Sequence, residues 1–132
     1  MTRTIEQTID FTGVDPARLF DLYIDPDQHS AATGGPVDIE PMVGGRFAAL
    51  GGLRGRYLAI EPSRLIVQTW RAKVWSDDDP DSILVLTFTS TETGGRVQLV
   101  QANVPERVHQ TIDDGWRQHY WDKWAKYLAH HS

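Results

Sequence analysis

The chain opens with alternating apolar and polar residues. From Thr4 to Phe11 the odd-numbered positions form one face, which is apolar apart from Gln7, and the even-numbered positions form a polar face. This period of two is typical of a half-buried β-strand, so we expect a strand here with Gln7 on its buried side.

Two Asp-Pro pairs follow, Asp15-Pro16 and Asp25-Pro26. An aspartate at the N-cap accepts hydrogen bonds from the first backbone amides of a helix, and proline fits the first helical position. The pairs therefore predict two short helices, the second of which ends near Gly34-Gly35.

The segment from Val37 to about Asn103 has the composition of strands. Three runs rich in β-forming residues are separated by Pro, Asp and Gly clusters, namely Arg64–Lys73, Ser82–Thr89 and Arg96–Asn103. The short connections between the runs favour an antiparallel meander.

Paired glycines interrupt the earlier part of this segment. Neither a Walker loop nor a dinucleotide-binding fingerprint occurs there. Gly44-Gly45 and Gly51-Gly52 instead predict hairpin turns, where positive φ is needed, and loops of two and of three residues both fit the second pair. Gly55, alone inside a strand, predicts a bulge or the close approach of another group.

The last segment has the period of a helix. After Pro105 the apolar positions follow at spacings of four, four, four and three, and they are Ile112, Trp116, Tyr120, Trp124 and Tyr127. This predicts an amphipathic helix with one aromatic stripe. Gly115 costs such a helix about 1 kcal/mol relative to alanine, and we expect close packing, ahead of ligand contact, to compensate.

Composition limits the class of protein. The 132 residues predict one domain, 1–132, and a formal net charge of −5 without a long block of either sign makes a nucleic-acid partner unexpected. The absence of cysteine excludes disulfides and thiolate chemistry. The alternating N-terminus predicts neither a signal peptide nor a membrane span, so a cytoplasmic location is expected.

Motifs for metal binding or catalysis are missing. His119 lacks a second histidine four residues away, and the pair His29-Ser30 lies outside any nucleophile-elbow motif. The acidic run from Asp77 to Asp81 lacks the glycine and glutamate of a calcium-binding loop and predicts a solvated turn. We therefore expect no metal, no cofactor and no catalytic residue.

Six short motifs resemble a known family. In order they are "HSAATGGP", "VGGRF", "IVQTWRAKVW", "LVLTF", "NVP" and "GWRQHYW". They resemble the C-terminal domain of the Hsp90 ATPase activator and its stand-alone bacterial homologues, over residues 3 to 129. The resemblance implies an α+β helix-grip fold of the START-like, Bet v 1-like superfamily. In this fold a curved antiparallel sheet of six to seven strands surrounds a long C-terminal helix, and two short helices follow the first strand. The element order derived above agrees with it.

The sequence departs from the family pattern in three ways. Ala32 stands where relatives often carry Phe, which would widen the interior, and the acidic run replaces a shorter Pro-Gly connection. The sequence also has no counterpart of the N-terminal domain with which the eukaryotic activator grips the chaperone. ATPase stimulation is therefore not expected to carry across unchanged.

Strand alternation and the resemblance together turn one set of side chains towards the C-terminal helix. The expected cavity residues are Phe47, Tyr57, Gln68, Trp70, Leu86, Gln101, Asn103, Trp116 and Tyr120. Mostly apolar side chains with a few amides and hydroxyls are the usual make-up of a small-molecule pocket. Two interpretations stay open: an open cavity, or a core filled by the five tryptophans.

From these observations we predict a non-enzymatic START-like domain that binds a small hydrophobic molecule between sheet and helix. The resemblance implies two alternatives. One is a domain that associates with an Hsp90-type chaperone in the stress response. The other is a cyclase- or hydrolase-type enzyme, which would need a polar pair in the cavity, and Tyr57 with Gln68 is the one such pair that the sequence suggests. A monomer and a weak homodimer both fit the threonine-rich outer strand face.

Overall fold

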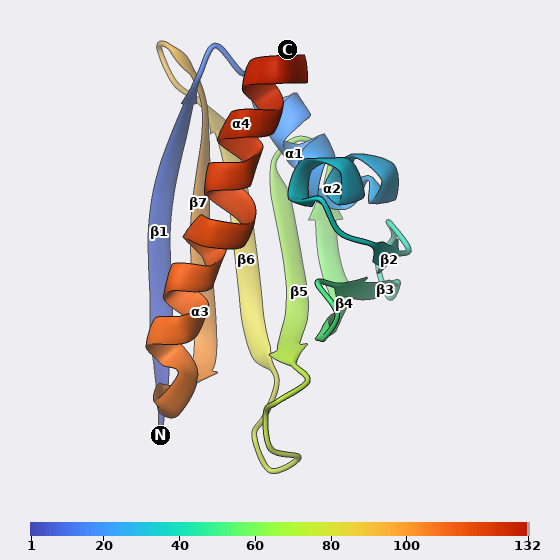
Figure 1. Ribbon diagram of the computed structural model, residues 1–132, viewed down its shortest axis with the longest axis vertical. Coiled ribbons are helices and arrows are strands. Elements are labelled where there is room, and N and C mark those ends of the chain that lie inside the picture. The colour runs from blue at the N-terminus through green and yellow to red at the C-terminus, as the bar shows by residue number, and fades with distance from the viewer. Residues whose placement is uncertain (132) are drawn as a thin grey trace.

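A computed structural model describes residues 1–131 and shows seven strands in one antiparallel sheet. The strands are β1 (Thr2–Thr12), β2 (Val37–Ile39), β3 (Arg46–Ala49), β4 (Leu53–Glu61), β5 (Leu65–Ala72), β6 (Ser82–Ser90) and β7 (Gly94–Pro105). Their order across the sheet is β1-β7-β6-β5-β4-β3-β2. The sheet curves around a long C-terminal helix, so the predicted helix-grip fold is confirmed (Figure 1).

Two short helices connect β1 to β2, as the Asp-Pro pairs predicted: α1 (Pro16–Ile24) and α2 (Pro26–Thr33). The Asp15 side chain accepts a hydrogen bond from the first turn of α1, and Asp25 accepts two from the first turn of α2. Gly34 ends α2 with a φ of 80°, in the left-handed conformation that glycine adopts without steric cost. α1 contacts β6 and β7, and α2 contacts β2 and α4, so both helices lie near the C-terminal end of the long helix (Figure 1).

The C-terminal helix is continuous but not uniform. It consists of a 3-10 turn η1 (Glu106–Val108), α3 (His109–Trp116), a π-helical turn η2 (Arg117–Trp121) and α4 (Asp122–His131). In the π-helical turn, the Asp122 N–H donates to the Arg117 carbonyl, five residues back. A π-turn adds one residue to the helical repeat and so shifts the stripe of side chains that face the sheet. Tyr120 and its neighbour Trp121 are consequently both buried, and the sequence pattern missed Trp121.

The glycine predictions for the hairpins are confirmed. Ala49 pairs with Leu53, so the β3–β4 loop has three residues, and its Gly51 has a φ of 73°. Gly55 lies so close to β5 that a Cβ atom would overlap the backbone oxygen of Thr69. This close approach is what a lone glycine inside a strand indicates.

The inward orientation predicted for Asn103 is wrong. The register between β1 and β7 shifts between Arg3 and Ile5, and on the opposite strand Asn103 has a left-handed φ of 71°. The additional residue in β7 reverses the alternation beyond Gln101. Asn103 is therefore exposed, and its side-chain amide donates to the Asp81 carbonyl at 3.5 Å.

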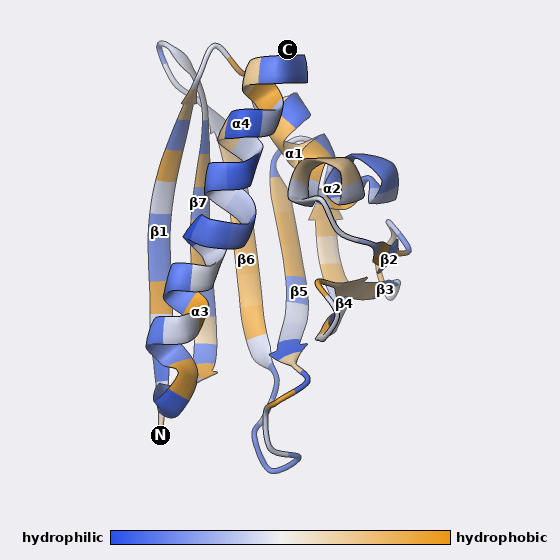
Figure 2. Cartoon of the chain, in the orientation of Figure 1, coloured by the Kyte–Doolittle hydropathy of each residue, from blue (hydrophilic) through white to orange (hydrophobic). Residues whose placement is uncertain are grey.

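The sheet and the helix enclose one hydrophobic core. Figure 2 shows apolar residues concentrated on the central strands β5 and β6 and hydrophilic residues on the outer face of α4. Within residues 1–131, no helix combines the length and the apolar character that crossing a bilayer requires.

Gln7 fixes the helix to the edge strand. Its side-chain oxygen accepts from the Trp121 indole N–H at 2.7 Å, and its amide donates to the Asp113 carboxylate at 2.7 Å and to the Asp113 carbonyl at 3.0 Å. The buried position predicted for Gln7 is confirmed. One amide thus joins β1 to the helix both before the π-turn, at Asp113, and within it, at Trp121.

Candidate functional site

A cavity of about 400 Å³ lies under α3, at the end of the sheet where the β3–β4 loop and the end of β5 meet the helix. Its lining residues are Leu50, Leu53, Trp70, Ala72, Val74, Trp75, Val108, Thr111, Ile112, Gly115, Trp116, His119 and Tyr120. This volume and this mostly aliphatic and aromatic lining are typical of sites for small molecules. The aromatic residues therefore fill only part of the space between helix and sheet.

The structure places the nine predicted cavity residues in three groups. Trp70, Trp116 and Tyr120 line the cavity. Five others are buried in the adjoining core without lining it: Phe47, Tyr57, Gln68, Leu86 and Gln101. Asn103 is exposed, as described above.

Sequence reasoning missed the residues that loops and the first turns of the helix contribute to the cavity. Leu50 belongs to the β3–β4 loop, and Trp75 lies in the connection from β5 to β6. The one available signal was Trp75 itself, because a large aromatic residue beside an acidic turn needs an apolar surface to cover.

At the other end of this space, a histidine lies fully buried among aromatic rings. The Nδ1 atom of His29 is 2.7 Å from the Tyr23 carbonyl, and Nε2 is 2.9 Å from the Tyr120 hydroxyl. A carbonyl only accepts, so Nδ1 carries the proton and Nε2 accepts from Tyr120. Burial lowers the pKa of His29 to about 4, against a smaller opposing effect of the Tyr23 hydrogen bond. The ring is thus neutral at pH 7.

A second buried bond connects α1 to the sheet. The Tyr23 hydroxyl donates to the Gln68 side-chain oxygen at 2.6 Å, and the Gln68 amide donates to the Thr69 carbonyl at 3.1 Å. The Tyr57 hydroxyl is buried without a partner in the described part of the chain, and burial raises its pKa. Tyr57 and Gln68, the polar pair considered for an enzyme, are therefore cross-strand neighbours on β4 and β5 without a hydrogen bond between their side chains within residues 1–131.

Aromatic packing completes this region, which we call the closed end and define as Tyr23, His29, Phe47, Gln68 and Tyr120. The Phe47 ring stacks on Tyr23 with centroids 5.8 Å apart, and His29 meets Tyr120 edge-on at 5.3 Å. All five side chains are buried. The helices α1 and α2 contribute Tyr23 and His29 and so fill this end.

A hydrogen-bonded relay fixes α3 to the middle of the sheet. The Trp116 indole N–H donates to the Gln101 side-chain oxygen at 2.8 Å, and the Gln101 amide donates to the Ser82 hydroxyl at 3.0 Å. Ser82 in turn donates to the Trp70 carbonyl at 2.6 Å. The Trp116 N–H is thus already engaged, and a ligand in the cavity would meet the ring and not the donor.

The cavity itself forms the open end, which we define as Trp70, Trp75, Ile112, Gly115 and Trp116. The rings of Trp70 and Trp75 lie 5.7 Å apart, and neither indole N–H has a hydrogen-bond partner within residues 1–131 although both are buried. A Cβ on Gly115 would contact only the His119 ring, at 3.8 Å. The close packing expected for Gly115 is therefore wrong, because the helix leaves free space at this position.

Arginines hold the loop that carries Trp75. Arg71 donates to the carbonyls of Ser76 and Asp79 at 2.9 and 3.0 Å and to the Asp81 carboxylate at 2.8 Å. Arg107 forms an ion pair with Asp79, and its hydrogen bond lowers the pKa of that carboxyl group. The acidic turn is therefore not simply solvated, since two arginines tie it to β5 and to the start of the C-terminal helix.

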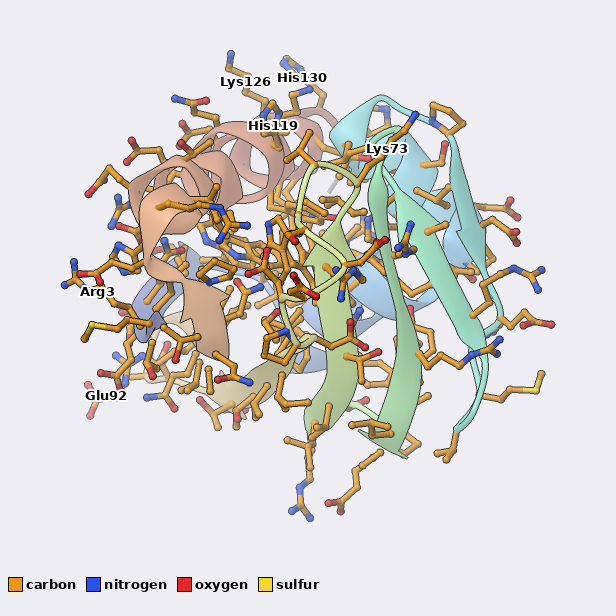
Figure 3. The ribbon with its side chains drawn as sticks, turned by 90° about the horizontal axis from the view of Figure 1, so that it is seen from below. Arg3, Lys73, Glu92, His119, Lys126 and His130 are labelled. Carbon is orange, nitrogen blue, oxygen red and sulfur yellow. The ribbon has the colours of Figure 1, made fainter. Side chains whose placement is uncertain are left out.

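Among the residues that the structure describes, the cavity lining contains no aspartate, glutamate, lysine or arginine. Its titratable side chains are Tyr120, whose pKa burial raises, and His119, which is exposed. Figure 3 shows His119 on the helix and Lys73 on the adjacent loop, on the same side of the molecule. Within residues 1–131, no three His, Asp or Glu side chains lie close enough together to hold a metal ion.

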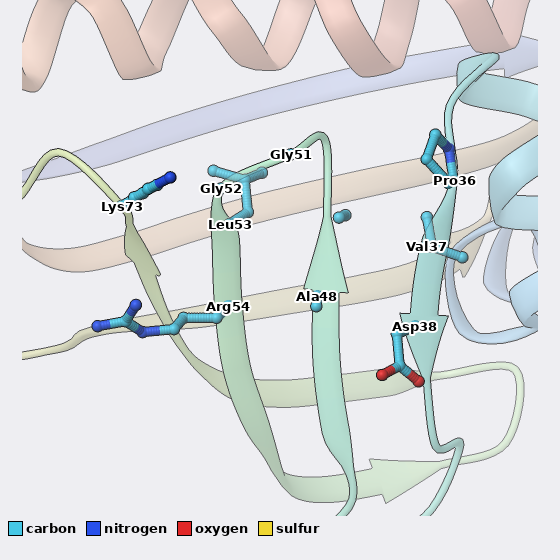
Figure 4. A pocket seen from close by; sticks show the side chains of 10 residues that line it. Pro36, Val37, Asp38, Ala48, Gly51, Gly52, Leu53, Arg54 and Lys73 are labelled. Atoms are coloured by element: carbon cyan, nitrogen blue, oxygen red, sulfur yellow. The ribbon is translucent and has the colours of Figure 1, made fainter.

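A second hollow, of about 480 Å³, lies over β2, β3 and β4 (Figure 4). It is larger but more open to solvent, and its lining includes glycines, alanines and the exposed Lys73 and Arg54 but no aromatic side chain. The cavity under α3 is the better candidate site, because it is the more enclosed of the two and its apolar walls can desolvate more of a small molecule's surface.

Residues 13–129 match the family described as Activator of Hsp90 ATPase homolog 1-like protein. Among curated proteins, the human "Activator of 90 kDa heat shock protein ATPase homolog 1" is 24% identical over 110 residues, which are 81% of this chain and 32% of that protein. The chain thus spans about a third of the length of the curated relatives it matches.

Solved structures share the fold at low identity. PFC0360w, an HSP90 activator from Plasmodium falciparum, superposes with a TM-score of 0.83 at 22% identity, over 98% of this chain and 96% of that one. Protein MLL2253 from Mesorhizobium loti gives 0.83 at 24% identity, over 98% and 99% of the two chains. CalU16 from Micromonospora echinospora gives 0.76 at 21% identity, over 96% and 75%.

Proposed function

The chain belongs to the Activator of Hsp90 ATPase homolog 1-like family, and from this premise we propose that it is a non-enzymatic domain that binds a small, largely apolar molecule. The observation that carries the proposal is the cavity of about 400 Å³ under α3, lined mostly by aliphatic and aromatic side chains. Burial of apolar surface, at about 25 cal/mol per Å², supplies the driving force for binding.

The residues around the cavity favour binding over catalysis. A general base must reach its substrate and have a pKa near the working pH. The Tyr120 hydroxyl is occupied by His29 and its pKa is raised, and His119 is exposed at the margin of the cavity. Within residues 1–131, the walls of this apolar compartment therefore carry no enclosed acid–base pair.

Gly115 allows a direct test. A Gly115→Leu variant places a side chain in the cavity, whereas Gly115→Ala adds one methyl group to a position with free space around it. A panel of small aromatic and aliphatic compounds is titrated into the three proteins by isothermal calorimetry, and melting temperatures are recorded in parallel. We expect wild type and Gly115→Ala to bind the same members of the panel, and Gly115→Leu to bind them at least about tenfold more weakly.

A ligand present at a hundred times its Kd stabilises the native state by about 2.7 kcal/mol, so the melting temperature rises for every true ligand. The proposal is wrong if no compound binds the wild type. It is also wrong if Gly115→Leu, once shown to be folded, binds as tightly as the wild type does.

A second candidate function is association with an Hsp90-type chaperone. The family match and the printed names of the human and Plasmodium relatives favour it. The test is the ATPase rate of an Hsp90-type chaperone with and without this chain. Because the chain spans about a third of its curated relatives, we expect weak stimulation. If the two functions are separate, Gly115→Leu leaves that stimulation unchanged while it abolishes ligand binding.

A further inference from the structure

Four arginines surround a hollow on the outer face of the sheet, the face opposite the C-terminal helix. The hollow has a volume of about 430 Å³, and we call it the arginine hollow, after Arg46 on β3, Arg54 and Arg56 on β4, and Arg71 on β5. We propose that it binds a phosphate monoester group. The proposal does not depend on the apolar cavity or on the ligand of that cavity.

The strand register places these like charges next to one another. Arg46 lies directly opposite Arg56, and Arg54 lies directly opposite Arg71. The Cβ atoms of directly opposed residues are about 5 Å apart, and like charges at such positions destabilise a sheet. Arg54 and Arg56 are two residues apart on one strand, so they also share a face at a separation of about 7 Å. An anion bound among the four guanidinium groups would offset this repulsion.

Carboxylates of the chain neutralise two of the four arginines. Arg46 forms ion pairs with Asp38 at 2.8 Å and with Glu40 at 3.4 Å. Arg71 forms an ion pair with Asp81 at 2.8 Å, and Asp81 is the one carboxylate in the lining within residues 1–131. The positive charge that is left over therefore belongs to the two arginines of β4.

Arg54 and Arg56 are both exposed, and neither forms an ion pair in the part of the chain that the structure describes. Arg56 donates to the Gly44 carbonyl at 3.1 Å, which does not neutralise its charge. Lys73 adds a further cation beside Arg54, since both line the neighbouring hollow (Figure 4). A phosphate monoester has a charge of about −1.5 to −2 at pH 7, whereas a carboxylate has only one negative charge, so the phosphate matches this excess better.

Short side chains leave room for the anion. Ala48 lies opposite Arg54 on β3, and the Thr69 hydroxyl on β5 accepts a hydrogen bond from the Arg56 backbone N–H at 2.9 Å. Both residues line the hollow between the longer arginines. A guanidinium group presents paired N–H donors that fit two oxygens of one phosphate, so the two arginines of β4 can bind the same group.

The test titrates glycerol phosphate and acetate into the full chain at pH 7, with the ionic strength held constant by sodium chloride. Arginine Nε–H and backbone amide signals in ¹H–¹⁵N spectra report where and how strongly each compound binds. We expect saturable shifts confined to the arginine hollow, and we expect glycerol phosphate to bind at least about tenfold more tightly than acetate.

Arg54→Gln and Arg56→Gln should each weaken the binding of glycerol phosphate at least about tenfold. The matched control is Arg64→Gln, because Arg64 is an exposed arginine that pairs with Glu61 outside the hollow, and this variant should bind as wild type does. Without phosphate, Arg54→Gln should melt no lower than wild type, since it removes one member of a like-charge pair.

A free ester and a phosphorylated side chain present the same group, so a short phosphoserine peptide is titrated as well. Equal affinities support a small phosphate ester as the ligand, and tighter binding of the peptide supports a phosphorylated protein. The proposal is overturned if neither phosphate compound binds more tightly than acetate, or if Arg64→Gln weakens binding as much as the two hollow variants do. Neither result affects the function proposed for the cavity under α3.

Discussion

The two ends of the space beneath the C-terminal helix are built differently although the same sheet and the same helix form both. At the closed end, α1 and α2 add Tyr23 and His29, aromatic rings fill the volume, and the His29, Gln68 and Tyr120 side chains are hydrogen-bonded. At the open end no further element within residues 1–131 covers the sheet, the β5–β6 loop supplies Trp75, and a cavity of about 400 Å³ is left.

This difference shows how one fold combines stability with a binding site. A well-packed interior is stable because each buried group has contacts and each buried polar atom has a partner. A binding site must give up part of these packing contacts so that a ligand can supply them. We therefore expect substitutions to affect stability mainly at the closed end and ligand binding mainly at the open end.

The largest effect is expected from Phe47→Ala at the closed end. Phe47 is fully buried and packs against Tyr23, Tyr57 and His29, so its truncation leaves a hole that its rigid neighbours cannot fill. We expect the free energy of unfolding, measured in urea, to fall by about 3 to 5 kcal/mol.

Ile112→Ala is the matched truncation at the open end. Ile112 is half-buried and already faces the cavity, so we expect a loss of about 1 kcal/mol or less. Equal losses for the two variants would remove the proposed difference in packing.

The next largest effect is expected from a fall in pH, which should lower the free energy of unfolding through His29 at the closed end. The pKa of His29 is about 4 in the folded chain and about 6.5 when unfolded, so the unfolded state binds the proton more readily between these values. Stability is therefore complete above pH 6.5 and is lost as the pH falls towards 4, with a loss of about 2 to 3 kcal/mol at pH 4.5.

Urea titrations at pH 7 and pH 4.5 measure this loss, and His29→Asn, which lacks the titrating ring, should show a smaller pH dependence over the same range. The carboxyl groups of Asp10, Asp38 and Asp79 have lowered pKa values, so their contribution is lost only at lower pH. An NMR titration in which the His29 ring protonates near pH 6.5 in the folded chain would contradict the prediction.

Two tyrosine-to-phenylalanine variants separate hydrogen bonding from packing. Tyr23→Phe leaves the Gln68 side-chain oxygen buried without its donor, and we expect a loss of about 1 to 3 kcal/mol. Tyr57→Phe removes a hydroxyl that has no partner within residues 1–131, and we expect no loss or a small gain. Thermal unfolding of the two variants side by side is the measurement, and the same loss in both would show that the Tyr23 bond contributes nothing specific.

A small effect, in the direction of greater stability, is expected at Gly115. Alanine is the better helix former by about 1 kcal/mol, and the added methyl group meets only the His119 ring at an ordinary distance. Gly115→Ala should thus raise the free energy of unfolding by up to about 1 kcal/mol. Gly55→Ala is the control, because its methyl group would overlap the β5 backbone, and it should destabilise the chain. A destabilised Gly115→Ala would mean that this glycine is needed for packing after all.

Local chemistry made several elements predictable. Asp15 and Asp25 cap their helices through amides two or three residues away, so no tertiary contact was needed to recognise them. Alternation placed Gln7 and the inward side chains of β4, β5 and β6 correctly, because the side-chain period of a strand is a property of the backbone.

Other features depended on departures from regular geometry. One bulge in β7 turned Asn103 outward, and one π-turn brought Trp121 into the core. Neither departure has a local sequence signal as strong as a helix cap. The sequence pattern also missed His29 as a core residue. Its partners, Tyr23 and Tyr120, belong to two other helices, so no local pattern around His29 indicates that it is buried.

The sequence alone thus determined the order of the elements, the helix caps, the hairpin glycines and the inward face of the central strands, because each of these depends on residues a few positions apart. Only the tertiary structure decided where the interior is filled and where it is hollow. The filling of the interior depends on how α1 and α2 pack at one end of the long helix and how the β5–β6 loop packs at the other. Volumes and donor–acceptor pairs formed between distant segments leave no periodic trace in the chain.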